Sequence, residues 1–242
     1  MSSTTAFFNP AVPFTNDLKG WEIQDDDPTI SKQRGQALGK DGDEIASKTH
    51  DEKETVTLNF VAKETTAKIP SVGVVESGYH IDSASVKFVQ NDYVKMTLTC
   101  HKHLGTGVTS HGTPCRTYTP SWGANGIGII WGCPDAEDID DVVVIPSGAG
   151  VRSFTYTIQC NHVDESGSQG DFLAGDNYDG SEQAEVEICD TGTITAASGW
   201  DLMQKGSPKG NTVAQAGRAT LEHHLAHDVN TATLDLESSS ST

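Results

Sequence analysis

The sequence has little positive charge, and this shortage excludes one class of function. It carries 16 Lys and Arg against 34 Asp and Glu, which gives a formal net charge of -18 with histidine neutral. Proteins whose main task is to grip nucleic-acid phosphates carry a surplus of positive charge instead. We therefore expect no sequence-specific nucleic-acid binding.

Long hydrophobic runs are also lacking. The apolar stretches at residues 127–131 and 142–145 fall far short of the roughly 20 residues that a bilayer span requires. The first ten residues have neither a basic n-region nor an apolar h-region, so they predict no secretory signal. We expect a soluble protein that is made in the cytoplasm and has no contact with a membrane.

Cysteines are few and odd in number. The five cysteines are scattered over about ninety positions, and without a secretory signal the expected state is reduced and mostly buried. A disulfide framework is the less favoured alternative. The residues are Cys100, Cys115, Cys133, Cys160 and Cys189.

Alternation of apolar and polar residues is the main structural signal that is present. In residues 55–61 it places Val56, Leu58 and Phe60 on one face, and similar patterns occur at residues 84–88, 94–100, 154–160 and 184–188. Strands with one polar face are typical of antiparallel sheets. The sequence predicts a mainly β fold, an antiparallel sandwich or barrel-like core with long polar arms and loops and few short helices.

The chain divides into one predicted domain with polar ends. Residues 17–236 form a single β-rich domain, with an insertion-like region at about 104–151, whereas residues 1–16 and 237–242 are flexible. Residues 17–54 carry eleven acidic and six basic residues with little periodicity, which indicates a long polar loop or arm. Residues 211–227 fit a helix and a strand almost equally well.

Two of the predicted strands end alike. Residues 96–103 and 156–163 each consist of a strand, a terminal cysteine and a polar exit that contains histidine. They indicate either two related hairpin units or a chance similarity between strands that end in a buried cysteine. Chance is the favoured interpretation.

Most of the negative charge is local. Between Cys133 and Asp190 there are fourteen acidic residues against Arg152 alone, in clusters at 135–141, 164–165 and 171–190. A solvated acidic face is the first interpretation. The alternatives are a Ca²⁺ site, best represented by residues 176–182, and a wall past which a polyanion slides without adhering. The 176–182 segment departs from the EF-hand spacing and lacks its twelfth-position Glu.

One set of residues has the chemistry of a zinc site. Cys100, His103, His111 and Cys115 form a C-x2-H-x7-H-x3-C pattern, which is competent for tetrahedral Zn²⁺. The spacing matches no common zinc module, and the alternation assigns Cys100 to the apolar face of a strand. A buried cysteine followed by a polar loop is the preferred interpretation, so we predict no metal or cofactor ligands.

Signatures of catalysis are missing. The sequence contains no G-x-S-x-G elbow, no H-E-x-x-H helix and no phosphate-binding loop. His223 and His227 share a face of a helix, but on a strand they lie about 13 Å apart, too far for one metal ion. We therefore predict no catalytic residues and no enzyme, with a metal-dependent hydrolase as the minor alternative.

A stretch of about thirty residues resembles a known family. Residues 33–50, with an Asp-Gly-Asp turn at 41–43, lead into the strand at 55–61, and this arrangement is similar to a segment of bacteriophage tail tube proteins and related virion structural proteins. The resemblance implies a β-sandwich or barrel-like core whose copies form rings, commonly hexameric, that stack into a tube for DNA. It also implies other tail or neck proteins as partners and a place in the virion.

We therefore expect a non-enzymatic virion structural protein that self-assembles, most of all the tail tube, past which DNA moves only as a polyanion. Copies would join through unpaired edge strands, for which residues 84–88 and 94–100 are the candidates. The alternative is a β-rich binding, adhesion or capsid-attached module with cation-dependent acidic loops.

Overall fold

The computed structural model describes residues 18–38, 40, 44–76, 78–103, 116–146, 148–166, 172–189, 194–206 and 217–225. Strands dominate these residues, and the helical element named among them is the short 3-10 turn η2. The elements in chain order are β1 (Trp21–Leu38), β2 (Glu44–Ala62), β3 (Val75–Glu76), β4 (Tyr79–Tyr93), β5 (Lys95–His103), β6 (Trp131–Gly132), η2 (Ala136–Asp138), β7 (Val143–Val144), β8 (Val151–Ser166), β9 (Phe172–Ile188), β10 (Thr195–Ala196), β11 (Asp201–Gly206) and β12 (Gly217–His224).

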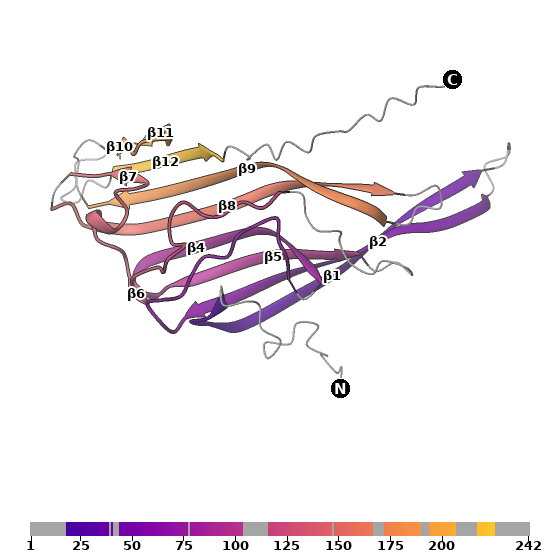
Figure 1. Cartoon of the computed structure of the whole chain (residues 1–242), viewed down its shortest axis with the longest axis horizontal. Helices are drawn as coiled ribbons and strands as arrows, with labels where there is room; N and C mark the ends of the chain where they lie inside the picture. Colours follow the sequence, from indigo (N-terminus) through magenta and orange to yellow (C-terminus); the bar gives the residue numbers. More distant parts are fainter. Residues whose placement is uncertain are drawn as a thin grey trace, which may run out of the picture.

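One large antiparallel sheet forms the body of the protein (Figure 1). Its strands follow the order β1-β2-β5-β4-β8-β9-β12-β11, while β3 and β6 each add to β4, and β10 with β7 forms a separate two-stranded sheet. The first and last strands of this order do not pair with each other, so the sheet is open. The prediction of a mainly β, antiparallel fold is confirmed, but the sheet does not close into a barrel.

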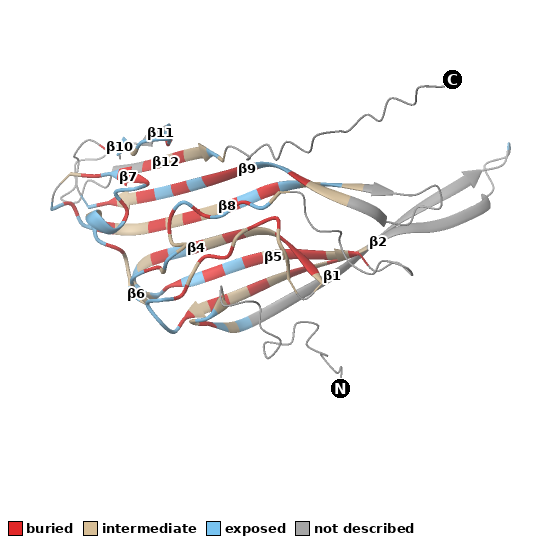
Figure 2. Cartoon of the chain, viewed as in Figure 1, coloured by how far each residue is buried: buried red, intermediate tan, exposed pale blue. Residues whose placement is uncertain are grey.

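The five predicted strands all lie in this sheet, and their apolar positions face its core. Buried bands alternate with exposed or intermediate bands along β5, β8 and β9 (Figure 2), as a half-buried strand requires. Each large side chain that is fully buried contributes roughly 1.5–3 kcal/mol relative to exposure. The buried set on the sheet includes Val56, Leu58, Phe60, Ala84, Val86, Phe88, Met96, Leu98, Cys100, Phe154, Tyr156, Ile158, Ala184, Val186, Ile188, Ala219 and Leu221.

Two connecting segments cover the apolar face of the sheet. The chain that follows β2 and the described residues 116–146 between β5 and β8 cross in front of the sheet (Figure 1), and they are joined by the backbone bridge between Val72 and Tyr118. Trp122 packs its ring edge-on against Phe88 and Phe154, and its indole N–H donates to the carbonyl of Asp138 at 2.8 Å. The described part of the insertion-like region therefore supplies part of the core.

The segment at residues 17–54, which we predicted to be a long polar loop or arm, is largely a β-hairpin and not an irregular loop. β1 pairs with β2 from Trp21 to Leu38, with register shifts that mark irregularities along the hairpin. Its residues read as a loop because the run Asp25-Asp26-Asp27-Pro28 has no alternation and few strand formers. Backbone pairing along the hairpin overrides that weak local preference.

The window at residues 211–227 adopts the strand alternative where it is described. β12 pairs with β9 from Gly217 to His224, and Ala219 and Leu221 are buried. His227 and the proposed flexible ends at residues 1–16 and 237–242 lie outside the described residues. No helix in the described part of the chain has the length and apolar character to cross a membrane.

Both strands that we expected at a free edge are internal, so that prediction was wrong. β4 pairs with β5 on one side and with β8 on the other, and β5 lies between β2 and β4. The outermost strands of the sheet are β1 and β11. Alternation alone does not separate an internal strand from an edge strand, because both bury one face.

Two hairpins continue past the point where their neighbours stop pairing. β5 pairs with β2 only over Lys53–Val61 of β2, whereas β1 accompanies β2 out to Glu44. Similarly, β4 pairs with β8 only as far as Gln159, whereas β8 and β9 stay paired out to Ser166 and Phe172. We call the second projection, from Asn161 to Ser166 and from Phe172 to Tyr178, the β8–β9 arm.

Candidate functional site

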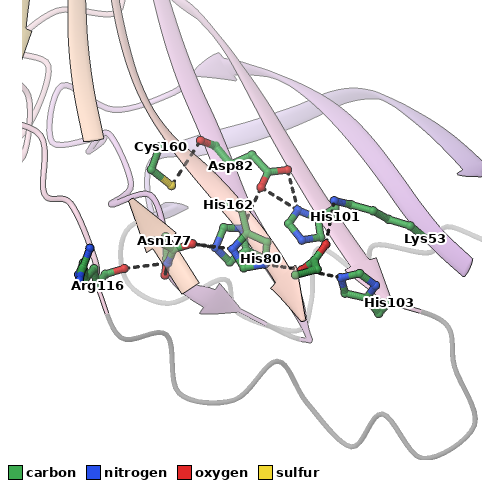
Figure 3. A network of polar contacts seen from close by, with 11 residues as sticks. Lys53, His80, Asp82, His101, His103, Arg116, Cys160, His162 and Asn177 are labelled. Atoms are coloured by element: carbon green, nitrogen blue, oxygen red, sulfur yellow. Dashed lines mark hydrogen bonds and ion pairs between the residues drawn. The ribbon is translucent and has the colours of Figure 1, made fainter. Parts of the chain in front are cut away.

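Histidines from three strands meet where the β8–β9 arm leaves the sheet (Figure 3). His80 lies near the start of β4, His101 and His103 lie at the end of β5, and His162 lies at the base of the arm. His80 and His101 are cross-strand partners in the β4–β5 ladder. His80, His101 and His103 are buried, which is unusual for polar rings and requires that they have partners.

Asp82 joins the first two of these histidines. The register between β4 and β5 shifts between Ile81 and Ser83, and Asp82 occupies that irregularity. Its Oδ1 lies 2.8 Å from Nδ1 of His80 and 2.7 Å from Nδ1 of His101. Burial favours the neutral acid, but the hydrogen bonds from His101 and His80 outweigh it and hold the pKa of Asp82 well below its usual range.

Asp164 joins the other two. Its Oδ1 lies 3.0 Å from Nε2 of His103 and 2.7 Å from Nε2 of His162, and Lys53 approaches its other oxygen at 3.9 Å. Burial opposes ionisation here too, yet the hydrogen bonds from His103 and His162 lower the pKa of Asp164 far below the usual carboxylate value. Both carboxylates are therefore ionised at neutral pH.

Asn177 of β9 fixes the orientation of two rings. Its amide nitrogen donates to the backbone carbonyls of Gly73 and Arg116, at 2.8 and 2.7 Å. Its Oδ1 must then be an acceptor, and it lies 2.6 Å from Nε2 of His80 and 2.7 Å from Nδ1 of His162. Both rings accordingly point an N–H at this oxygen.

The rings are packed closely enough to influence one another. The centroids of His80 and His162 are 4.3 Å apart, and those of His101 and His162 are 4.9 Å apart. Burial lowers the pKa of His101 despite its contact with Asp82. Burial also disfavours the charged form of His162, but the hydrogen bonds to Asp164 and Asn177 prevail and raise its pKa.

Two overlapping sets of ligand atoms result, and each has metal-binding chemistry. His80, Asp82 and His101 form a set of three. The second set, which we call the quartet, offers four ligand atoms that all lie within 4.8 Å of one another. The quartet consists of His101, His103, His162 and Asp164.

The zinc pattern considered from sequence is not assembled as its spacing suggested. β5 keeps an unbroken register against β2, so Cys100 and His103, three residues apart, point to opposite faces of the strand. Cys100 is buried with Leu98 and Met96 on the apolar face. His111 and Cys115 lie outside the described residues.

The calcium candidate at residues 176–182 is not a loop. These residues belong to β9. Asn177 accepts hydrogen bonds from histidine rings, and Glu182 is buried against Tyr156 and Ser121. Their oxygens therefore serve different partners and do not surround one point. The cluster at 135–141 behaves as the solvated face that we expected, because Asp135, Glu137 and Asp141 are exposed there.

The described cysteines do not form disulfides with one another. Cys100 and Cys160 are buried, Cys133 is half-buried and Cys189 is exposed. Burial and the nearby Asp82 charge raise the pKa of Cys160 to about 12, and burial raises the pKa of Cys133 to about 11. These two thiols stay protonated, as structural thiols do.

The sequence contained one signal of this site. The two similar strand ends at residues 96–103 and 156–163 are the segments that bring His101, His103 and His162 together. The similarity that we attributed to chance therefore coincides with a shared location. His80, Asp82 and Asn177 carried no comparable signal.

Comparison of the chain with protein-family models and with curated proteins finds no match.

Proposed function

We propose that this chain is a non-enzymatic structural subunit that self-assembles through the edges of its open sheet, and that the assembly is the stacked-ring tube of a phage tail. The tube is the form of assembly implied by the resemblance of residues 33–50. The proposal is carried by the length and composition of the outermost strands.

Edge strands present backbone N–H and C=O groups that another strand can complete. β1 is 18 residues long, and among the described residues its ladder partner is β2 alone. At the other edge, β11 carries Leu202 and Met203 with exposed fractions of 38% and 60%. A ring of identical subunits satisfies both edges at once, because the two different edges meet in each head-to-tail contact.

Exposed apolar side chains at the two ends of the strands support stacking of such rings. Tyr93 and Trp131, 51% and 52% exposed, pack edge-on against each other where β4 ends. Val163 and Tyr178, 49% and 44% exposed, lie on the β8–β9 arm. The antiparallel register of β4 and β8 places these pairs at opposite ends of the sheet, as contacts between successive rings require.

The charge distribution supports passage of DNA rather than its capture. The net charge of -18 and the exposed acidic residues near η2 repel phosphate, so a polyanion that passes the protein would not adhere. Replacement of these exposed carboxylates would leave folding intact, because their side chains are already solvated.

The experiment measures assembly of an edge variant beside a matched control. Light scattering and negative-stain images of the purified wild-type chain are expected to show rings or tubes. Met203→Lys places a charge on an outermost strand, and we expect it to reduce assembly at least tenfold while the circular dichroism spectrum stays unchanged.

The control is Val144→Lys in β7, which is 48% exposed but outside the large sheet, and it should assemble as the wild type does. A wild-type chain that stays monomeric over a wide concentration range contradicts the proposal. Equal assembly of both variants contradicts the role of the β11 edge.

A further inference from the structure

The hydrogen-bond geometry at His162 calls for more positive charge than a neutral ring supplies. Both nitrogens of His162 face acceptors, because Nδ1 meets Oδ1 of Asn177 and Nε2 meets Oδ1 of Asp164, each at 2.7 Å. A neutral imidazole carries a single N–H and satisfies only one of them. A second proton on the ring satisfies both, and so does a cation placed between Nε2 and the carboxylate.

Residues around the quartet already orient its rings for that role. Asp82 receives the N–H on Nδ1 of His101 at 2.7 Å, which leaves the lone pair on Nε2. Asn177 does the same for His162, and its own amide is held by the carbonyl groups of Gly73 and Arg116. A metal-ligating histidine characteristically gives its second N–H to a carboxylate or a carbonyl oxygen in this way.

The dimensions suit a small ion with nitrogen and oxygen ligands. Ligand atoms about 2.0–2.2 Å from a tetrahedral Zn²⁺ stand about 3.3–3.6 Å from one another. The quartet holds its ligand atoms within 4.8 Å, with contacts of 2.7 and 3.0 Å at Asp164, so adjustments of about 1 Å are sufficient. Imidazole nitrogens disfavour Ca²⁺ and Mg²⁺, which bind oxygen.

We infer that the quartet binds one Zn²⁺ ion, which fastens the β8–β9 arm to the end of β5. Four protein ligands complete a tetrahedron, which is the arrangement of a structural site and leaves no position for substrate. His101 and His103 come from β5, whereas His162 and Asp164 come from the arm. Because the pairing of β4 with β8 stops at Gln159, the ion links parts that the sheet ladder does not join directly.

The test uses the full-length, untagged chain and measures metal directly. Protein dialysed against trace Zn²⁺ is expected to retain one zinc per chain, and Co²⁺ is expected to give the visible absorption of a tetrahedral site. His162→Gln should weaken zinc binding about 100-fold or more, and Asp82→Asn about 10-fold to 100-fold.

The matched control is His224→Gln, whose histidine is 70% exposed in the side chain and should leave zinc binding unchanged. His103→Gln replaces His162→Gln if the latter does not fold without metal. Substoichiometric zinc in the folded wild type contradicts the proposed site. Wild-type zinc affinity in both His162→Gln and His103→Gln contradicts it as well.

The fastening role has its own readout. Amide hydrogen exchange over residues 161–166 is expected to slow at least tenfold on addition of Zn²⁺, while exchange in β12 stays unchanged. Stoichiometric zinc without slower exchange in the arm overturns the fastening role. Assembly measured with and without chelator separates this inference from the proposed function, because rings can form whether or not zinc is bound.

Discussion

Two buried polar centres in this protein use similar side chains in different ways. The first is the carboxylate of Glu182 in the middle of β9, which is fully buried. It accepts hydrogen bonds from the hydroxyl of Tyr156, from the backbone N–H and hydroxyl of Ser121 at 2.6 Å each, and from Nδ1 of His223 at 2.8 Å. The protein itself therefore supplies the hydrogen-bond donors that this buried carboxylate needs.

The second centre is the quartet with Asp82 and Asn177. There the acceptors outnumber the donors that neutral rings supply, because His80 and His162 each meet acceptors at both nitrogens. The Glu182 centre lies beneath the segment between β5 and β8 that covers the sheet, and it holds that segment against β9. The second centre lies where the β8–β9 arm leaves the sheet. The two centres therefore differ in their donors: protein groups satisfy the Glu182 carboxylate, whereas neutral rings in the second centre leave acceptors that an added proton or a cation can satisfy.

Removal of the Glu182 carboxylate should have the largest effect on stability. Glu182→Ala leaves four donor groups from three residues without their acceptor, one of them the buried hydroxyl of Tyr156, and we expect a loss of about 3–5 kcal/mol in the free energy of unfolding. Urea denaturation measures it, with Glu185→Ala, an exposed residue on the same strand, as the control. Zinc binding of any folded Glu182→Ala protein should be unchanged. A loss below about 1 kcal/mol in the free energy of unfolding would contradict the structural role of the Glu182 centre.

A crowding substitution should affect the second centre alone. A Cβ at Gly175 would lie 2.6 Å from both Cε1 and Nε2 of His162, so Gly175→Ala must displace that ring from Asp164. We expect about 2 kcal/mol of destabilisation without metal and at least tenfold weaker zinc binding. Isothermal titration with Zn²⁺ measures the second effect.

The control is Gly150→Ala, whose Cβ meets its nearest neighbour, the sulfur of Cys189, at an ordinary 3.8 Å. Unchanged zinc affinity in Gly175→Ala would show that the position of His162 does not control the site.

The sheet could be predicted from sequence because one-sided burial leaves a local pattern. Val56, Leu58 and Phe60 alternate with polar residues, and the same rule identified β4, β5, β8 and β9. The β1–β2 hairpin was missed because its stretch around Asp25 to Pro28 has no such pattern. Its strands are instead specified by pairing with each other over many residues.

The site could be predicted only in part, because its contacts are distant in sequence. His80 and Asn177 are 97 residues apart, and no local spacing reports that their side chains touch. The zinc pattern was misleading for a related reason. It counted Cys100 and His103 as near neighbours, although strand geometry sends residues three apart to opposite faces.

The smallest expected effect concerns a single donor at the Glu182 centre. Burial, reinforced by the negative charge of Glu182, raises the pKa of Tyr156, so its hydroxyl stays protonated and donates to the carboxylate. Tyr156→Phe keeps the ring packed near Trp122 and Trp200 and removes that one bond.

We expect Tyr156→Phe to lower the free energy of unfolding by about 1 kcal/mol, as the loss of one hydrogen bond does, with zinc binding unchanged. The control Tyr93→Phe, at a tyrosine that is 51% exposed, should lie within about 0.5 kcal/mol of the wild type. Combined with Glu182→Ala, the tyrosine variant should cost almost nothing further, because its partner is already gone. If the losses in free energy of unfolding of the two substitutions were fully additive, Glu182 and Tyr156 would stabilise the protein independently and not through their shared hydrogen bond.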